Sequence, residues 1–135
     1  MSIEEIPHTA DVKIRVHAKT RNELFSEAFF ALMQVLYGTD RKGGEIRTVA
    51  LSAGDDESLL WEFLSEVLFV SEVSNLVFST ADVVITGHSL VARLDGEPFD
   101  RNRHSGGTEV KGISYYGLAI SHDANGYMLD VVFDV

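Results

Sequence analysis

Two groups of side chains near the ends of the chain have the residue types that a divalent metal site needs. At the start of the first long predicted strand, the segment Pro7-His8-Thr9-Ala10-Asp11 offers an imidazole and a carboxylate. In the last predicted strand, Asp130 and Asp134 alternate onto one face, and the terminal carboxylate of Val135 is expected beside Asp134. Carboxylates in a chain without cysteine are hard oxygen ligands, which suit Ca²⁺, Mg²⁺ or Mn²⁺ better than a structural zinc.

Each of these groups also has a simpler explanation. His8 and Asp11 would cap a turn, and acidic side chains on an exposed strand face are in most proteins only solvated. Lys111 alternates to the opposite face from Val110, and a lone lysine in a strand ordinarily keeps its charge in water. The residue types alone therefore leave a metal site and a solvated surface both open.

Other reactive groups are weaker candidates. Arg101-Asn102-Arg103-His104 is followed by Ser105-Gly106-Gly107, but the phosphate-loop pattern Gly-x-x-x-x-Gly-Lys-Ser/Thr is absent, and such loops are mostly mobile connections. No Gly-x-Ser-x-Gly elbow indicates a nucleophilic serine, and no pair of histidines has the spacing of metal ligands. His88, His104 and His122 lie in predicted turns or loops, where exposed histidines are ordinary.

Composition limits the class of protein. The chain has 135 residues, of which 45% are apolar and 24% charged, and this is typical of a single folded domain over residues 1–135. The absence of cysteine excludes disulfides, thiolate metal sites and a cysteine nucleophile. With no long apolar run and no apolar signal core at the N-terminus, we expect a cytoplasmic protein without a membrane span.

The net charge bears on the partner. Twenty-one acidic and 11 basic side chains give a formal net charge of −10. A surface of this sign repels phosphate backbones, so direct nucleic-acid binding is disfavoured. A basic protein partner, or a site for cations, fits the charge better.

The periodicity of apolar residues predicts the elements that carry these groups. In chain order they are a strand through Val12–Ala18, a helix from Arg21 to Tyr37, a strand over Glu45 to Leu51, a helix that begins within Ser52 to Glu57 and ends near Ser74-Asn75, and four strands over Leu76 to Thr86, Ser89 to Leu94, Val110 to Ser121 and Tyr127 to Val135. Gly38 is expected to end the first helix in the left-handed conformation, and Asp95-Gly96 is expected to form a turn before a long polar stretch. This order predicts an α+β fold, with one largely antiparallel sheet and two helices packed on it.

Several segments resemble, in their order, the signatures of the archease family. They are His8-Thr9-Ala10-Asp11, Thr20 with Glu23-Leu24-Phe25, Leu59-Leu60-Trp61-Glu62-Phe63-Leu64-Ser65-Glu66, Gly96-Glu97-Pro98-Phe99-Asp100, His104, Glu109-Val110-Lys111-Gly112-Ile113-Ser114-Tyr115, and Asp134-Val135. The resemblance covers nearly the whole chain, and it is the ordered set rather than any one segment that is specific.

The resemblance implies a protein cofactor, not an enzyme. Archeases assist the tRNA-splicing RNA ligase that joins 3′-phosphate or 2′,3′-cyclic-phosphate ends to 5′-hydroxyl ends with GTP and Mn²⁺. By resemblance, this protein would promote guanylylation of the active-site histidine of that ligase and support multiple turnover in tRNA splicing or RNA repair. Asp11, Asp134 and the terminus at Val135 would bind the metal with His8 nearby, and Lys111 matches the functionally important lysine of the family.

Three positions depart from the family pattern. Gly112 stands where alanine is usual and Phe63 where tryptophan is common, and both changes are expected to alter packing only. Tyr116 stands where the family often has histidine, and this leaves open whether a ligand or contact attributed to that histidine applies here.

Two other classes of function remain open. The first is a metal-dependent hydrolase built on Asp11 and Asp134, against which stands the lack of an obvious general base. The second is a chaperone or adaptor for RNA-modifying enzymes, which would need no metal. Replacement of Asp11 by alanine separates them, because a pure adaptor would still bind its partner.

Overall fold

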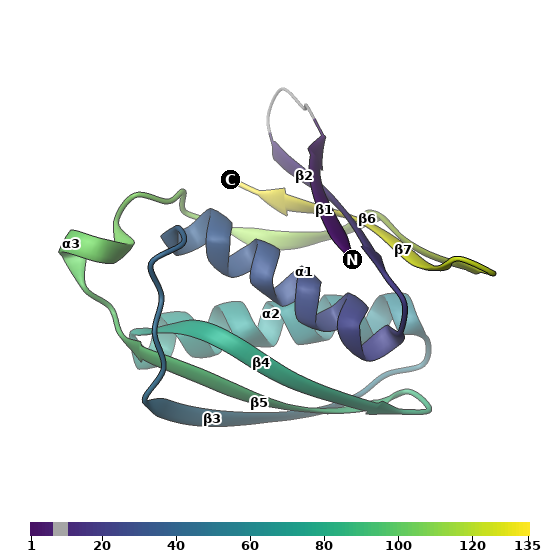
Figure 1. The fold of residues 1–135 in the computed structure, drawn as a ribbon, viewed down its shortest axis with the longest axis horizontal. Coiled ribbons are helices and arrows are strands. Elements are labelled where there is room, and N and C mark those ends of the chain that lie inside the picture. Colours follow the sequence, from purple (N-terminus) through teal and green to yellow (C-terminus); the bar gives the residue numbers. More distant parts are fainter. Residues whose placement is uncertain (7–10) are drawn as a thin grey trace.

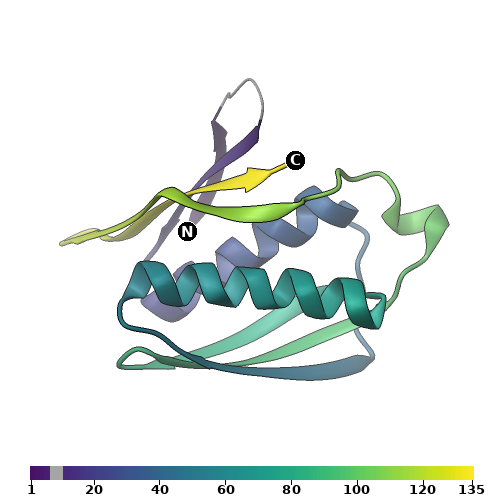
Figure 2. The ribbon, with the colours of Figure 1, turned by 180° about the vertical axis from the view of Figure 1, so that it is seen from behind.

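The computed structural model describes residues 1–6 and 11–135. They form three layers, in which two long helices lie between a four-stranded and a three-stranded antiparallel sheet (Figure 1, and from behind in Figure 2). The elements are, in chain order, β1 Ser2–Ile6, β2 Asp11–Ala18, α1 Arg21–Tyr37, β3 Glu45–Ser52, α2 Asp56–Ser74, β4 Leu76–Thr86, β5 Ser89–Pro98, α3 Arg101–His104, β6 Gly112–Asp123 and β7 Gly126–Asp134.

The α+β class and the antiparallel pairing are confirmed, but the expected single sheet is two sheets. One has the strand order β1-β2-β7-β6, and the other has the order β3-β5-β4. The last four strands are therefore two separate hairpins, β4–β5 and β6–β7, each of which belongs to a different sheet. The chain crosses from one sheet to the other through the segment between β5 and β6.

The two long helices have the ends that the sequence predicts. The Thr20 side chain accepts a hydrogen bond from the backbone N–H of Glu23, and the Asp55 side chain accepts one from the backbone N–H of Ser58. Helix α2 ends at Asn75, which is in the left-handed conformation. Gly38 has the positive φ expected of a helix stop, 81°, but its ψ of −162° is not that of a left-handed helix.

The width of the apolar surface on each helix explains the second sheet. At 100° per residue, the buried side chains of each helix span about half of its circumference, which is more than one sheet can cover. The buried residues of α1 are Leu24, Phe25, Ala28, Phe29, Ala31, Leu32 and Met33, and those of α2 are Leu59, Leu60, Phe63, Leu64, Val67, Leu68 and Ser71. Phe25 and Phe63 lie between the helices with their ring centroids 6.1 Å apart.

Strand β5 continues through Asp95-Gly96, so the prediction of a turn at these residues is wrong. The register of β4 against β5 shifts between Phe78 and Thr80, directly opposite this position. A Cβ atom on Gly96 would lie 2.5 Å from the carbonyl oxygen of Val77. Glycine is therefore required here by the close approach of two strands, not by a turn.

Two short elements were not predicted. Strand β1 pairs with β2 at the edge of the four-stranded sheet, and α3 is a single turn within the expected polar loop. None of the described helices is both long and apolar enough to cross a membrane.

The core position of Phe63 gives a stability prediction with a control on the same helix. Phe63 is fully buried, whereas Phe69 is 58% exposed. We expect Phe63→Ala to lower the free energy of unfolding by about 3–5 kcal/mol, because it leaves a cavity between the layers. Phe69→Ala should change it by less than about 0.5 kcal/mol. Urea denaturation followed by circular dichroism measures both, and equal losses would contradict this packing.

Candidate functional site

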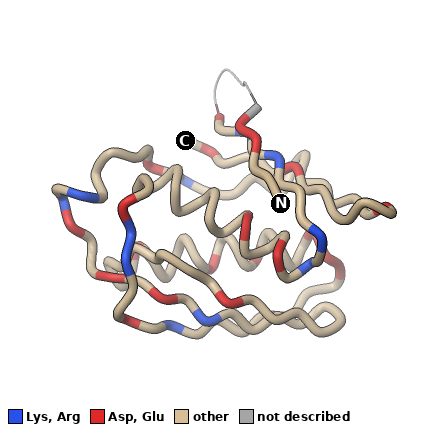
Figure 3. The backbone as a smooth tube through the Cα atoms, viewed as in Figure 1, with Lys and Arg blue, Asp and Glu red and all other residues tan. Residues whose placement is uncertain are grey.

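The pairing of β2 with β7 brings Asp11 and Asp134 together. They are directly opposite residues in the antiparallel register, although 123 positions separate them along the chain. Residues in such pairs have Cα atoms about 4.5–5.5 Å apart and side chains on the same face of the sheet. Both are half-buried, and Figure 3 shows the acidic ends of β2 and β7 beside the C-terminus.

Strand β6 completes the surroundings of Asp134 on its other side. Gly112 is the register partner of Asp134 on β6, and a Cβ atom there would lie 3.9 Å from Asp134 Oδ2. The backbone N–H of Lys111 donates a hydrogen bond of 2.7 Å to the carbonyl oxygen of Asp134. The structure thus brings Asp11, Asp134 and the backbone of Lys111 to one end of the sheet, next to Val135. His8 lies outside the described residues.

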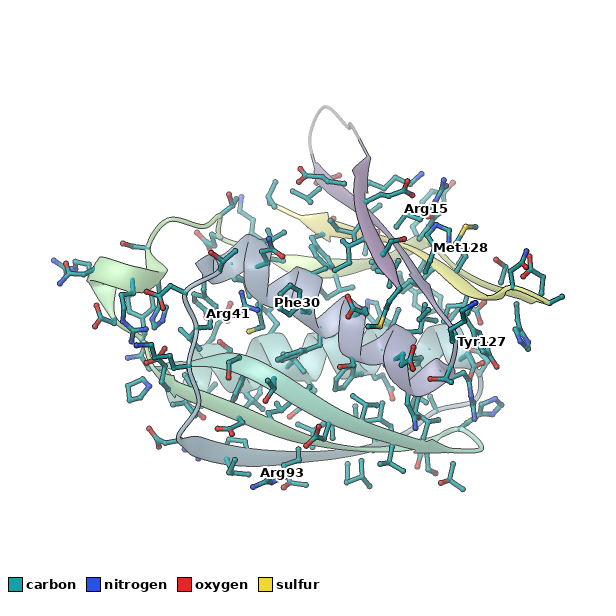
Figure 4. All side chains as sticks on the ribbon, in the orientation of Figure 1. Arg15, Phe30, Arg41, Arg93, Tyr127 and Met128 are labelled. Carbon is teal, nitrogen blue, oxygen red and sulfur yellow. The ribbon has the colours of Figure 1, made fainter. Side chains whose placement is uncertain are left out.

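A second pair on the same two strands shows what is unusual about the first. Arg15 and Asp130 are also directly opposite, and the guanidinium donates two hydrogen bonds to the carboxylate, of 2.7 and 3.1 Å. The side chain of Arg15 points away from the helices (Figure 4), and it lowers the pKa of Asp130. At the other end of these strands, the opposite residues are two carboxylates. Like charges directly opposite destabilise a strand pair.

No ion pair within the described residues neutralises these two carboxylates. Among the ion pairs of residues 1–6 and 11–135, none includes Asp11, Asp134 or Lys111, and the Lys111 residue is exposed. A divalent cation between the carboxylates would turn this repulsion into attraction, and the donor atoms are the hard oxygens that Ca²⁺, Mg²⁺ and Mn²⁺ prefer. The two residues therefore fit part of a metal site.

The described part of the chain does not contain a full set of side-chain ligands. No group of three or more His, Cys, Asp or Glu side chains within it could hold a metal ion. Further donor atoms would have to come from other groups, and the sequence suggests the His8 side chain and the terminal carboxylate of Val135. The metal site remains a prediction.

The segment between β5 and β6, which leads to Lys111, carries a partly buried ion cluster. Glu97 on β5 accepts hydrogen bonds from both terminal nitrogens of Arg103, one of them 2.9 Å long, and from the backbone N–H of Lys42 at 2.8 Å. These contacts, led by the hydrogen bonds from Arg103, lower the pKa of Glu97 to about 2. His104 completes the cluster with Nε2 at 3.2 Å from Glu97.

His104 was expected in an exposed loop, and that expectation is wrong. It is only 1% exposed, with the rings of Tyr37 and Phe99 against it. Its Nδ1 accepts a hydrogen bond of 2.9 Å from the backbone N–H of Asp100, so the proton of the neutral ring is on Nε2 and is donated to Glu97. The four-residue spacing of Asp100 and His104, which closes one turn of helix, is the signal that sequence reasoning missed.

From this cluster the chain is tied to α1 before it reaches Lys111. The backbone N–H of Thr108 donates to the carbonyl oxygen of Val35 at 2.8 Å, which satisfies a group near the end of α1. Gly107 lies so close to the backbone of Leu36 that any side chain at this position would overlap with it. The segment that was expected to be a mobile connection is therefore fixed to α1.

Comparisons with known proteins give the family. The pattern of the Archease protein family (MTH1598/TM1083) matches residues 3–135. This chain belongs to the archease family. The archease of Methanosarcina barkeri is 35% identical over 138 residues, which cover 98% of this chain and 94% of that protein. The archease of Pyrococcus abyssi is 33% identical over 138 residues, with 98% and 97% covered.

Solved structures agree with this archease fold. The solution structure of Methanobacterium thermoautotrophicum protein 1598 is 25% identical and superimposes with a TM-score of 0.86, and 98% of each chain is covered. An archease from Thermotoga maritima, named as a possible chaperone, has a TM-score of 0.69 at 18% identity, with 98% of this chain and 96% of that chain covered. The second likeness concerns the fold alone.

The like-charged pair leads to a prediction about metal binding. We expect Ca²⁺ or Mn²⁺ to raise the melting temperature of the wild-type protein, and Asp11→Asn and Asp134→Asn to abolish this rise. Without metal, each variant should be as stable as the wild type or about 0.2–1 kcal/mol more stable, because the repulsion is gone. The matched control is Asp130→Asn on the same strand face, which loses the ion pair with Arg15 but should keep the metal response. A full metal response in the Asp11 and Asp134 variants would contradict the site.

The ion cluster leads to a prediction about pH. The pKa of Glu97 is about 2 in the folded protein, whereas its ordinary value is 4.5. The ionised carboxylate therefore stabilises the fold fully above about pH 4.5, and this stabilisation is lost as the pH falls through about 2. Glu97→Gln should therefore be less stable than the wild type at neutral pH, and the difference should shrink toward zero on acidification. Chemical denaturation at a series of pH values measures it, and a constant difference would contradict the account.

Proposed function

We propose that this archease is a protein cofactor of a tRNA-splicing RNA ligase, and that it promotes guanylylation of the ligase and its multiple turnover. The observation that carries the proposal is the pairing of Asp11 with Asp134 across β2 and β7, with the backbone of Lys111 bonded to Asp134. These are the residues that the family resemblance assigns to ligase activation. The proposed setting is the cytoplasm, and the proposed partner is the ligase protein rather than RNA.

The residues have distinct proposed roles. Asp11 and Asp134 would hold a divalent ion (Ca²⁺, Mg²⁺ or Mn²⁺), with Val135 and His8 as the remaining donors. When bound, such an ion supplies positive charge for phosphate oxygens. Lys111 would add its ammonium group, because it is exposed while its backbone is fixed to Asp134. The preceding connection from His104 to Thr108 keeps this end of β6 in position, which reduces the entropy lost on docking.

A role as cofactor protein agrees better with the side chains than a role as hydrolase. Among the hydrogen bonds of the described residues, no serine hydroxyl is bonded to a histidine, so no serine nucleophile is paired with a histidine base there. In a metal-dependent hydrolase Asp11 and Asp134 would both be ligands, which leaves neither to act as the general base. His104 has both ring nitrogens engaged within the fold and is shielded from substrate.

The chaperone or adaptor function is the second candidate. It is favoured by the related Thermotoga maritima archease, which is named as a possible chaperone. An adaptor would bind its partner without a metal, so Asp11→Ala would leave its binding and its effect intact.

A ligase assay tests the proposal. The purified cognate RNA ligase is incubated with GTP and Mn²⁺, and the rate of GMP attachment is measured with and without this protein. The wild type should raise the rate, whereas Asp11→Ala, Asp134→Ala and Lys111→Ala should each lose at least about tenfold of that stimulation, because the charge near the phosphates is lost. Lys19→Ala, an exposed lysine outside the site, is the matched control. An unchanged rate with the wild-type protein would overturn the proposal.

A further inference from the structure

The outer side of α2 carries large apolar side chains that residues 1–6 and 11–135 leave exposed. Phe69 and Val73 are 58% and 68% exposed, and on the neighbouring strand β6 the adjacent tyrosines Tyr115 and Tyr116 are 52% and 92% exposed. Helix α2 and edge strand β6 lie side by side in Figures 1 and 2, and they are in contact. Exposed aromatic groups of this size are typical of the centre of protein interfaces.

The exposed side of α2 links Phe69 and Val73 near its C-terminal end to Tyr115 near its N-terminal end through polar side chains. The spacing of Ser58, Glu62, Glu66, Phe69 and Val73 is four, four, three and four residues, which places them along one line of the helix about 22 Å long. We call these five residues, together with Tyr115 and Tyr116, the α2 face. It is as long as the contact region of an ordinary protein interface.

One end of the α2 face is held rigid. The hydroxyl groups of Tyr115 and Ser58 are 3.0 Å apart, and the Tyr115 ring lies edge-on to Trp61 with centroids 6.2 Å apart. The indole N–H of Trp61 in turn donates to the carbonyl oxygen of Ile113 at 2.7 Å. An open pocket of about 300 Å³ is lined by Ser58, Trp61, Glu62 and Tyr115. A partner would meet an aromatic socket that is already ordered, which lowers the entropic cost of binding.

The charge of α2 indicates the kind of partner. The helix contains five acidic residues and no basic residue. Asp56 is paired with Arg21 at 3.0 Å, and Glu57 accepts from the backbone N–H of Ile120. The remaining three, Glu62, Glu66 and Glu72, belong to none of the ion pairs found within residues 1–6 and 11–135. Apolar groups with uncompensated carboxylates between and beside them complement a surface on which lysine or arginine surrounds an apolar group.

We propose that the α2 face is the surface by which this protein docks on a basic patch of the RNA ligase. This inference rests on the proposed function. An enzyme that holds RNA ends must present lysine and arginine to their phosphates, so it offers the positive charge that the α2 face needs. Strand β6 runs from Gly112, beside Asp134, to Tyr115 in three residues, or about 10 Å. The two surfaces lie on opposite sides of the edge strand β6, so a partner that wraps around this edge would contact the α2 face and the Asp11–Asp134 pair together.

Docking and activation predict different kinetic effects, and this separates the two proposals. A variant of the α2 face should raise the concentration of this protein that gives half-maximal ligase guanylylation, while the rate at saturation stays unchanged. Asp11→Ala should lower the rate at saturation instead. Docking through opposite charges should also weaken as salt rises, and less steeply when one of the carboxylates is removed.

Matched variants test the surface. Val73→Lys is compared with Val84→Lys, because Val84 is also an exposed valine but lies on the outer side of the three-stranded sheet. Glu66→Lys is compared with Glu27→Lys, because Glu27 is a half-buried glutamate of the other long helix, α1. Binding to the purified cognate ligase is measured by titration calorimetry without GTP or metal, after circular dichroism shows that each variant is folded. We expect the two α2 variants to bind about tenfold or more weakly and the two controls to bind within about twofold of the wild type.

The outcomes that would overturn the proposal differ from those for the function. If the wild type stimulates the ligase and the α2 variants bind as tightly as the controls, the docking surface is wrong and the function stands. If the wild type neither binds nor stimulates the ligase, both proposals fail. If the wild type sediments as a dimer that the α2 variants dissociate, the face belongs to a second copy of this chain, and the docking proposal fails.

Discussion

Strands β2 and β7 join residues 11–18 to residues 127–134 in one antiparallel register, at the centre of the four-stranded sheet. The alternate residues Ile14, Val16, Leu129 and Val131 face the helices from these strands, and the charged residues face outward. A slip of one residue would bury the charges and expose the apolar side chains, so the core fixes the register. The position of Asp11 opposite Asp134 is a consequence of this register, as is the ion pair of Arg15 with Asp130.

The two pairs divide stability and function between the ends of the same strands. Arg15 and Asp130 attract each other across the strands, whereas Asp11 and Asp134 carry like charge, and we propose that a cation between them turns this repulsion into attraction. The connection from β5 to β6 is fixed by the Glu97 cluster and by contacts with α1, and it ends where the Lys111 backbone binds Asp134. A repulsive pair held by a rigid frame is a feature expected of a binding site rather than of a structural one.

Local signals in the sequence were sufficient for the helices but not for the arrangement of the sheets. The capping box at Thr20 and the apolar periodicity predicted the first helix nearly to the residue, and the acidic segment within Ser52 to Glu57 located the start of the second, because these interactions lie within a few positions. The division of the last four strands between two sheets depends on which face of each helix they cover, and no local pattern contains this information.

The positions of His104 and Gly96 were misjudged for a similar reason. The burial of His104 and the close contact of Gly96 come from residues distant in the chain or on another strand. The candidate site came from the family resemblance, and the register then brought Asp11 and Asp134 together.

The central claim is that Asp11 and Asp134 share one divalent ion. It is tested most directly by a crystal structure of the protein grown with Mn²⁺, with diffraction data collected at the manganese absorption edge. The account predicts one strong anomalous peak within coordination distance of a carboxylate oxygen of each aspartate, and no such peak in Asp134→Asn crystals grown in the same way. Ordered carboxylates with no peak between them, or a peak that persists in the variant, would contradict it.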